Sequence, residues 1–329
     1  MAKLMEEVRR GLIAQGYALK TERTYVHWIR KYVKHHLPNH PRDLGADEVN
    51  QYLTYLAVDC NLSPTTQNQC RAALLFLYRL LGIELDGIHI IVAKKDKRVP
   101  TVLTEDETMR LINNLQGVYK IMGQLLYGGG LRLNECLKLR VKDLDLVNRT
   151  ITVRDTKGNQ DRVTILPISV IPALQLHLAK VEAIHREDLA NGYGDVEMPY
   201  ALARKYPRGA YEFGWQYVFP AGQFSEDPRS NRIGRHHIYE SSIQRAVKAA
   251  AMKAGIHKPC GPHTLRHCFA TDLLRAGVDI RTVQELMGHK KVETTMIYTH
   301  ALGAAAVRSP LDRYSPVHAS HEIKQRVQV

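Results

Sequence analysis

The sequence predicts an α-rich protein of two domains: a small all-helical N-terminal domain and a larger, mainly helical domain with one small antiparallel β-sheet. Three observations support this fold class. Apolar residues recur at helical spacing through most of the 329 residues. One segment, residues 145–167, alternates apolar and polar residues as a hairpin does. A basic stretch without helical period, residues 91–103, separates residues 1–90 from residues 104–312.

The N-terminal domain is expected to consist of several short helices with basic outer faces. In "TERTYVHWIRKYVKHHL" one stripe at i, i+3, i+4, i+7 and i+8 is apolar or aromatic: Tyr25, Trp28, Ile29, Tyr32 and Val33. Three cations fall elsewhere on this helix: Arg30, Lys31 and Lys34. A later helix begins at Ser63, an N-cap residue followed by Pro64 in the first turn, and runs to Gly82.

The second domain begins where Thr104 and Glu107 form a capping box, which starts a helix ending near Leu115. A further helix, "VYKIMGQLLYGGG", ends in three glycines, and "LRLNECLKL" resumes helical spacing after them. The following segments are, in order, the hairpin, a helix over 169–189, an insert at about 191–230, a mainly helical remainder and a polar tail over 313–329. We expect this tail to be disordered.

The composition indicates a protein that binds a polyanion. The chain has 46 Lys and Arg against 33 Asp and Glu, which gives a formal net charge of +13. Such an excess suggests nucleic acid or an anionic membrane surface as a partner. No run of 18 apolar residues could span a membrane, the N-terminus lacks the apolar core of a signal peptide, and the five cysteines include no close pair. We therefore expect a cytoplasmic protein without a membrane span or a disulfide framework.

The stretch "HTLRH" allows three interpretations. His263 and His267 are at i and i+4 on one helix face, which is the spacing of zinc ligands in metalloprotease helices. The intervening residues include no carboxylate base, and the permanent charge of Arg266 opposes a metal. The two histidines could instead be structural residues beside a solvated arginine. The third interpretation, a phosphate site, depends on residues elsewhere in the chain.

Six residues from distant parts of the chain have the chemistry to cleave a phosphodiester: Arg132, Lys157, His263, Arg266, His289 and Tyr298. Two guanidiniums can stabilise charge on the non-bridging oxygens without a metal. A tyrosine hydroxyl attacks once its proton is removed or its oxyanion is stabilised, and a lysine can protonate the leaving oxygen. Taken singly, each residue has an ordinary structural explanation, such as a local ion pair between Arg132 and Glu135.

Three boxes, in chain order, resemble those of the tyrosine recombinase, or phage-integrase-like, family. "GLRLNE" is similar to the family's first arginine box, "HTLRHCFAT" to its histidine and arginine box, and "LMGHKKVETTMIYTH" to its closing histidine and tyrosine box. The resemblance covers nearly the whole chain and implies a site-specific DNA recombinase with a DNA-clamping, SAM-like N-terminal domain and a catalytic domain. It also implies a tetrameric synapse, with residues near 302–311 docking on a neighbouring protomer.

The resemblance assigns a role to each of the six residues. These roles are phosphate binding for Arg132 and Arg266, nucleophilic attack for Tyr298, protonation of the leaving 5′-oxygen for Lys157, acid or base catalysis for His263, and a hydrogen bond to the transition state for His289. The 3′-phosphotyrosyl bond conserves the energy of the broken bond, so that no ATP, metal or other cofactor is expected. Arg162 is a second cation beside the turn that holds Lys157. His267 and His300 are expected to be structural or supporting residues.

The insert is rich in aromatic residues with cations among them. Residues 193–224 hold nine of the chain's 23 aromatic residues, a local concentration. Such a surface suits the stacking of unpaired bases, worth about 1–3 kcal/mol each. The alternative is a small satellite core in which Trp215, Tyr217 and Phe219 pack inward.

Three short motifs in and after the insert, "ALARKYP", "WQYVFP" and "RHHI", resemble the extra segment of integron integrases, the branch of the family that moves gene cassettes. The resemblance implies that the DNA partner includes a single strand folded into an imperfect hairpin, besides duplex sites. Its candidate contacts to extrahelical bases are Trp215, Pro228, His236 and His237. The alternatives are a recombinase of phage or dimer-resolution type that acts on duplex sites, and a non-catalytic DNA-binding relative.

Overall fold

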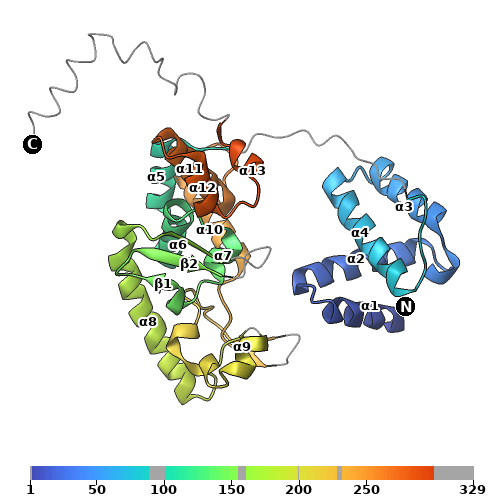
Figure 1. Ribbon diagram of the computed structural model, residues 1–329, viewed down its shortest axis with the longest axis horizontal. Coiled ribbons are helices and arrows are strands. Elements are labelled where there is room, and N and C mark those ends of the chain that lie inside the picture. Colours follow the sequence, from blue (N-terminus) through green and yellow to red (C-terminus); the bar gives the residue numbers. More distant parts are fainter. Residues whose placement is uncertain (1, 89–100, 155–160, 199, 228–231, 300–329) are drawn as a thin grey trace, which may run out of the picture. The chain divides into compact units, whose positions relative to one another are not determined.

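The computed structural model describes residues 2–88, 101–154, 161–198, 200–227 and 232–299 (Figure 1). The chain divides into two compact units, Met1–Arg98 and Val99–Val329. Both are mostly helical, and the second carries a small antiparallel sheet, which confirms the predicted fold class. Among the described helices, none combines the length and the apolar character needed to cross a membrane.

The first unit is a helical module around its own apolar core. Its α-helices are α1 (Ala2–Ala14), α2 (Leu19–His35), α3 (Ala46–Val58) and α4 (Pro64–Leu80). The predicted stripe of α2 is largely buried, and the hydroxyl of its Tyr32 lies 2.8 Å from that of Tyr78 on α4. The Ser63 hydroxyl accepts the backbone N–H of Thr66, which confirms its predicted N-cap role. The predicted cations of α2 are exposed.

The second unit arranges its helices around a core drawn from most of its length. Its α-helices are α5 (Glu105–Asn114), α6 (Gly117–Gly128), α7 (Leu133–Leu137), α8 (Ile171–Ala190), α9 (Tyr200–Lys205), α10 (Glu240–Lys253), α11 (Pro262–Arg275), α12 (Ile280–Met287) and α13 (Glu293–Met296). α6 lies centrally and contacts α5, α7, α8, α10 and α11. The capping box of Thr104 and Glu107 starts α5 as predicted.

A three-stranded antiparallel sheet forms where the sequence predicts a hairpin. Its strands are β1 (Leu144–Asp145), β2 (Thr150–Val153) and β3 (Arg162–Ile165), in the order β1-β2-β3. Ile151 and Val153 are buried on one face, as the alternation predicts. The register sets Val153 opposite Arg162, and β3 contacts α12. The sheet therefore delivers Arg162 toward the C-terminal helices.

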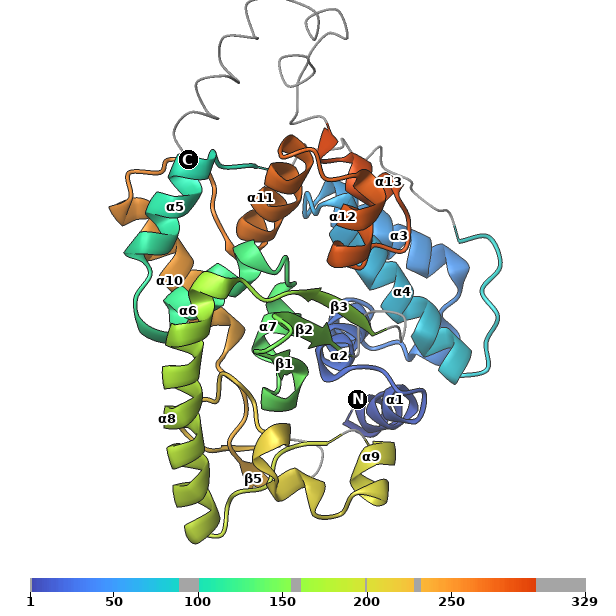
Figure 2. The same cartoon turned by 60° about the vertical axis from the view of Figure 1, so that its left-hand side comes forward.

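The long helix α8 runs along one side of the second unit, from the central helices to the insert (Figure 2). Its polar side chains fasten the insert and the segment after it. His177 donates to the Val218 carbonyl at 2.7 Å, and Asp188 holds Arg235 through two bonds of 2.6 and 2.7 Å. The short strands β4 (Ser225–Glu226) and β5 (Ile233–Gly234) pair nearby. The insert is thus anchored to α8 by hydrogen bonds and a bidentate ion pair.

The satellite-core interpretation of the insert is wrong in part. Val218 and Phe219 are fully buried within the main core of the unit, and Tyr217 is buried beside them, whereas Trp215 is only half-buried. These residues are buried because the Val218 N–H donates to the Leu139 carbonyl at 2.8 Å. This backbone bond holds the segment against the core. Only Trp215 is left partly open to solvent among the three aromatics considered.

Some predicted features lie outside the described residues. These are the linker up to residue 100, Lys157, Pro228, His300, residues 302–311 and the tail over 313–329.

Candidate active site

The glycine-rich turn before α7 directs Arg132 into the site. Gly130 has φ +61°, and a Cβ atom there would collide with the ring of Phe269, so this turn requires glycine. Arg132 then occupies the N-cap position of α7, where its backbone N–H donates to Glu135 Oε2 at 2.8 Å. The end of α6 and the start of α7 thereby fix the direction of the first predicted arginine.

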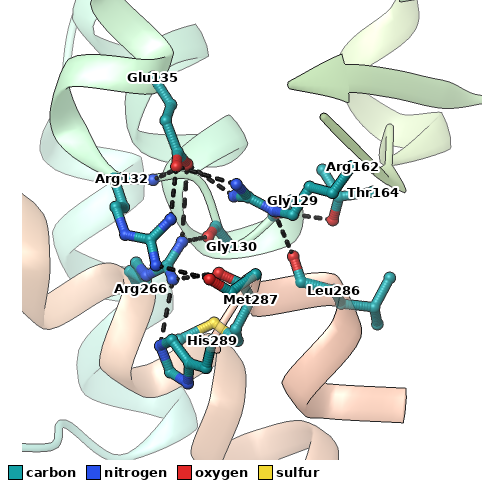
Figure 3. Close-up of polar contacts among 11 residues, drawn as sticks. Gly129, Gly130, Arg132, Glu135, Arg162, Thr164, Arg266, Leu286, Met287 and His289 are labelled. Carbon is teal, nitrogen blue, oxygen red and sulfur yellow. Dashed lines mark hydrogen bonds and ion pairs between the residues drawn. The ribbon is translucent and has the colours of Figure 1, made fainter. Parts of the chain in front are cut away.

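A buried carboxylate, Glu135, lies between three arginines (Figure 3). It accepts Arg132 Nη1 at 2.6 Å and Arg162 Nη1 and Nη2 at 2.9 and 2.6 Å, and Arg266 Nη1 lies 3.7 Å away. Burial raises the pKa of Glu135, but the hydrogen bonds and charge of Arg162 and the hydrogen bonds of Arg132 outweigh burial and lower the pKa to about 2. Glu135 is therefore ionised and offsets part of the repulsion among the three guanidiniums.

Arg162, at the start of β3, has a structural role, because its side chain bonds to α7 and α12. Besides its bidentate pair with Glu135, its Nε donates to the Leu286 carbonyl at 2.9 Å. Gly288 ends α12 with φ +62°, and a Cβ atom there would press on the Arg162 side chain at 2.7 Å. Because all three of its nitrogens donate to these buried partners, Arg162 is poorly suited to act as the general acid. The other cation predicted for that role, Lys157, lies outside the described residues.

Arg266 projects from α11 into the interior of the site. Its guanidinium donates to the Gly130 and Met287 carbonyls, so it joins the α6–α7 turn to the end of α12 (Figure 3). Burial and the nearby charge of Arg132 lower its pKa, yet a guanidinium remains charged at neutral pH. Arg132 donates to the Gly288 carbonyl at 2.9 Å while its side chain stays 33% exposed. The two predicted phosphate-binding arginines therefore share one centre, with Arg132 nearer the solvent.

His289, just after α12, faces Arg266. Arg266 Nη2 lies 3.3 Å from His289 Nε2 and can only donate, so Nε2 accepts and the ring proton is on Nδ1. Nδ1 lies 2.8 Å from Thr295 Oγ1 and donates to it. Burial and the charges of Arg266 and Arg132 lower the pKa of His289 to about 3. The donor role predicted for His289 therefore requires Nε2 to gain a proton.

Tyr298 is buried in a small apolar cluster with α11 and α12. The other buried members of this cluster are Phe269, Ala270, Val283 and Met287. The Tyr298 hydroxyl lies 2.9 Å from Nδ1 of His267, and its ring is nearly parallel to that of His289. Burial raises the pKa of Tyr298, against the opposing effect of the Arg266 and Arg132 charges. The predicted nucleophile thus lies beside the arginine centre, and its hydroxyl is hydrogen-bonded to a histidine.

His263 lies in the first turn of α11, one helical turn before His267, and it is exposed. Partial burial of its imidazole and the charge of Arg266 lower its pKa. The structure therefore brings Arg132 and Arg266 together with the closing histidine and tyrosine, and it places His263 one helical turn before His267 on α11.

The residues of "HTLRH" are not gathered into a ligand set in the described part of the structure. In the described part of the chain no three His, Cys, Asp or Glu side chains form a group that could hold a metal ion. Nδ1 of His267 is engaged with Tyr298, and Arg266 lies between the two histidines in sequence with a fixed positive charge.

Three of the four predicted contacts of the insert lie among the described residues, namely Trp215, His236 and His237. Lys142 and Arg140 place their charged ends over the ring of Trp215, with Arg140 at 5.8 Å from the ring centroid. The rings of His236 and His237 lie 4.0 Å apart, and the side chain of His236 is 42% exposed. Burial lowers the pKa of His237 to about 4, so this ring is neutral at physiological pH.

Two residues of the site were not predicted in their observed roles. Glu135 was considered only as a local partner of Arg132, and His267 was expected to be a structural or supporting residue. The available signals were weak: Glu135 is a lone acid in a basic set, and His267 shares a helix face with His263. Neither signal reveals which distant side chain the residue contacts.

Comparisons with known proteins identify the family of this chain. Residues 101–304 match the phage integrase family, and residues 4–85 match the phage integrase N-terminal SAM-like domain. An integrase/recombinase of Escherichia coli is 46% identical over 319 residues, which cover 96% of this chain and 95% of that protein. The tyrosine recombinase XerA of Thermococcus kodakarensis is 29% identical over 300 residues, which cover 90% of each chain.

Two solved structures with bound DNA share the fold. The XerH site-specific recombinase bound to its difH substrate, in a pre-cleavage complex, aligns with a TM-score of 0.57 at 22% identity over 93% of this chain and 84% of that one. A lambda integrase dimer bound to a COC′ core site aligns with a TM-score of 0.58 at 17% identity over 92% and 96%. At these identities the likeness concerns the fold alone.

Proposed function

This chain belongs to the phage integrase family and is a tyrosine recombinase, and we propose that it recombines DNA through a covalent intermediate on Tyr298. The observation that carries this proposal is the convergence of Arg132, Arg266, His289 and Tyr298 on one centre. These residues come from four separate elements, and no ordinary packing requirement gathers two arginines around a buried tyrosine.

In the proposed mechanism, Arg132 and Arg266 bind the non-bridging oxygens of the scissile phosphate. The partly exposed guanidinium of Arg132 is where a phosphate arriving from solvent makes its first contact. Arg266 stabilises the charge that builds up in the transition state, which counts for most in a site shielded from water. Glu135 supports both arginines by keeping them close without binding the phosphate itself.

Tyr298 then attacks the phosphorus, the bond to the 5′-oxygen breaks, and a 3′-phosphotyrosyl bond forms. The leaving 5′-oxygen takes its proton from Lys157, and His263 serves as a further acid or base. Once Arg266 turns toward the phosphate, Nε2 of His289 can take up a proton and donate to the transition state. Attack by a 5′-hydroxyl on the phosphotyrosine reverses these steps and joins the strands, so the reaction uses neither ATP nor a metal.

We further propose the integron integrase branch, with a folded single strand as a substrate and four protomers in the synapse. The insert supports this proposal, because it is fastened to α8 and yet leaves Trp215 and His236 partly exposed beside cations. Aromatic rings beside positive charge suit the stacking of unpaired bases. Trp215, Pro228, His236 and His237 are the proposed contacts.

The test compares two forms of one recombination site of a gene cassette. The full-length protein is mixed with the folded bottom strand and, separately, with the same sequence as a perfect duplex, and both binding and covalent adduct are measured. We expect tighter binding and more adduct on the folded strand. Equal affinity and equal cleavage on the two forms would exclude the integron branch and favour the alternative that acts on duplex sites. Absence of any adduct on either form would favour the non-catalytic alternative.

A further inference from the structure

When Tyr298 attacks the phosphorus its hydroxyl loses a proton, and the group that accepts this proton must lie within hydrogen-bond distance of the hydroxyl. Tyr298 is 3% exposed, so bulk water has little access to this group. His267 Nδ1 lies 2.9 Å from the hydroxyl oxygen, and the two ring centroids are 5.5 Å apart at 45°. This hydrogen bond joins α11 to the segment after α13.

In the described part of the chain, the hydrogen bond of the Tyr298 hydroxyl goes to His267, and His263, one helical turn earlier on α11, makes no such bond. The guanidiniums of Arg132 and Arg266 have no lone pair to offer. His289 lies with its ring 6.3 Å from the Tyr298 ring, its Nε2 faces Arg266, and its Nδ1 faces Thr295. His267 is therefore the imidazole whose nitrogen is directed at the nucleophile.

We propose that His267 is the general base that takes the proton from Tyr298 during DNA cleavage. This inference rests on the proposed function, in which Tyr298 is the nucleophile. The neutral imidazole carries its proton on Nε2 and its lone pair on Nδ1. The O–H bond of Tyr298 breaks, Nδ1 receives the proton, and the phenolate oxygen forms the bond to phosphorus while the bond to the 5′-oxygen breaks. In the reverse step the imidazolium returns the proton to the departing phenolate.

The surroundings of His267 suit this role. Burial, together with the charges of His263 and Arg266, lowers the pKa of His267 to about 4, so the free protein holds it neutral at pH 7 with its lone pair available. A bound phosphate offsets the charge of Arg266 and raises this pKa. His267 therefore becomes a stronger base when the substrate is in place, which couples activation of the nucleophile to DNA binding.

The test measures single-turnover formation of the covalent adduct between pH 5.5 and 9.5, with full-length protein and the DNA that the wild-type protein cleaves. His267→Asn keeps a hydrogen-bond acceptor near the position of Nδ1 but removes the base. We expect about a 10²-fold to 10³-fold slower adduct formation, within the range for loss of a general base, and a rate that climbs with pH. His257→Asn, at an exposed histidine in the loop after α10, is the matched control and should retain the wild-type rate.

A second measurement separates a base from a structural contact. Fluorinated tyrosine in place of Tyr298 ionises more easily, so it should recover much of the rate in His267→Asn while changing the rate little when His267 is present. A wild-type rate in His267→Asn, or a slow rate that fluorination does not recover, would overturn the inference. Failure of the proposed function would look different, because the wild-type protein itself would then form no adduct that depends on Tyr298.

Discussion

The Glu135 carboxylate receives both terminal nitrogens of Arg162, at 2.6 and 2.9 Å, and each of the two side chains is 9% exposed. The pair links α7 to β3, and Arg162 extends the link to α12 through the Leu286 carbonyl. Since Glu135 also binds Arg132 and lies near Arg266, one carboxylate connects the structural arginine to both proposed phosphate-binding arginines.

Glu135→Gln should destabilise the second unit strongly. The substitution keeps the size of the side chain but removes the negative charge among three guanidiniums. Breaking a buried ion pair from one side typically costs about 3–5 kcal/mol. The measurement is the thermal or urea transition of the second unit. Glu182→Gln is the matched control, because its ion pair with Arg186 is exposed and should be worth no more than about 1 kcal/mol. Equal transitions for the two variants would contradict the central role of Glu135.

The same carboxylate predicts a pH dependence of stability. The pKa of Glu135 falls from an ordinary value of 4.5 to about 2 in the folded protein, so its ionised form is favoured by folding. Its contribution is therefore complete above about pH 4.5 and is lost as the pH falls toward 2. Urea unfolding at several pH values should show the wild-type protein and Glu135→Gln converging as the pH falls through this window. A constant difference across it would show that the charge of Glu135 is not responsible.

Tyr298→Phe should abolish the covalent adduct and leave DNA binding nearly unchanged. Phenylalanine fills the same apolar cluster and loses only the hydroxyl that contacts His267. Denaturing gels of protein mixed with labelled DNA detect the adduct, and native gels measure the binding. Persistence of the adduct in this variant would mean that another residue is the nucleophile.

Removal of divalent metals should not slow cleavage. The charge that builds up on the phosphate is stabilised by guanidiniums in the proposed mechanism, so no metal takes part. Adduct formation is measured with and without excess EDTA after dialysis of the protein. A loss of activity that zinc or magnesium restores would revive the metal interpretation of His263 and His267.

Trp215→Ala should weaken binding to the folded strand more than binding to duplex DNA. Loss of one stacked base is worth about 1–3 kcal/mol, or roughly a 5-fold to 150-fold change in affinity. Tyr211→Ala is the matched control, because this aromatic is exposed in the same insert but was not among the predicted contacts. An equal loss on both DNA forms would mean that Trp215 stabilises the insert rather than reading an extrahelical base.

Much of this protein follows from local patterns in the sequence. The stripe of α2, the N-cap at Ser63 and the capping box of Thr104 and Glu107 were all predicted, because each depends on residues within a few positions of one another. The alternation in β2 was predicted for the same reason. Which residues of the insert are buried and which are exposed was not predicted. Burial of Val218 and Phe219 depends on a backbone hydrogen bond to Leu139, far earlier in the chain.

The sequence by itself determined the fold class, the order of the helices and the residue types needed to cleave a phosphodiester. Only the tertiary structure decided which of those residues contact one another. It shows that Glu135 lies between three arginines, that Arg162 is a structural residue, and that His267 faces the proposed nucleophile. The physical reason is the distance along the chain over which each kind of interaction acts. Helical periodicity and capping act over a few residues, whereas a hydrogen bond between α11 and Tyr298 forms only when packing has brought distant segments within about 3 Å.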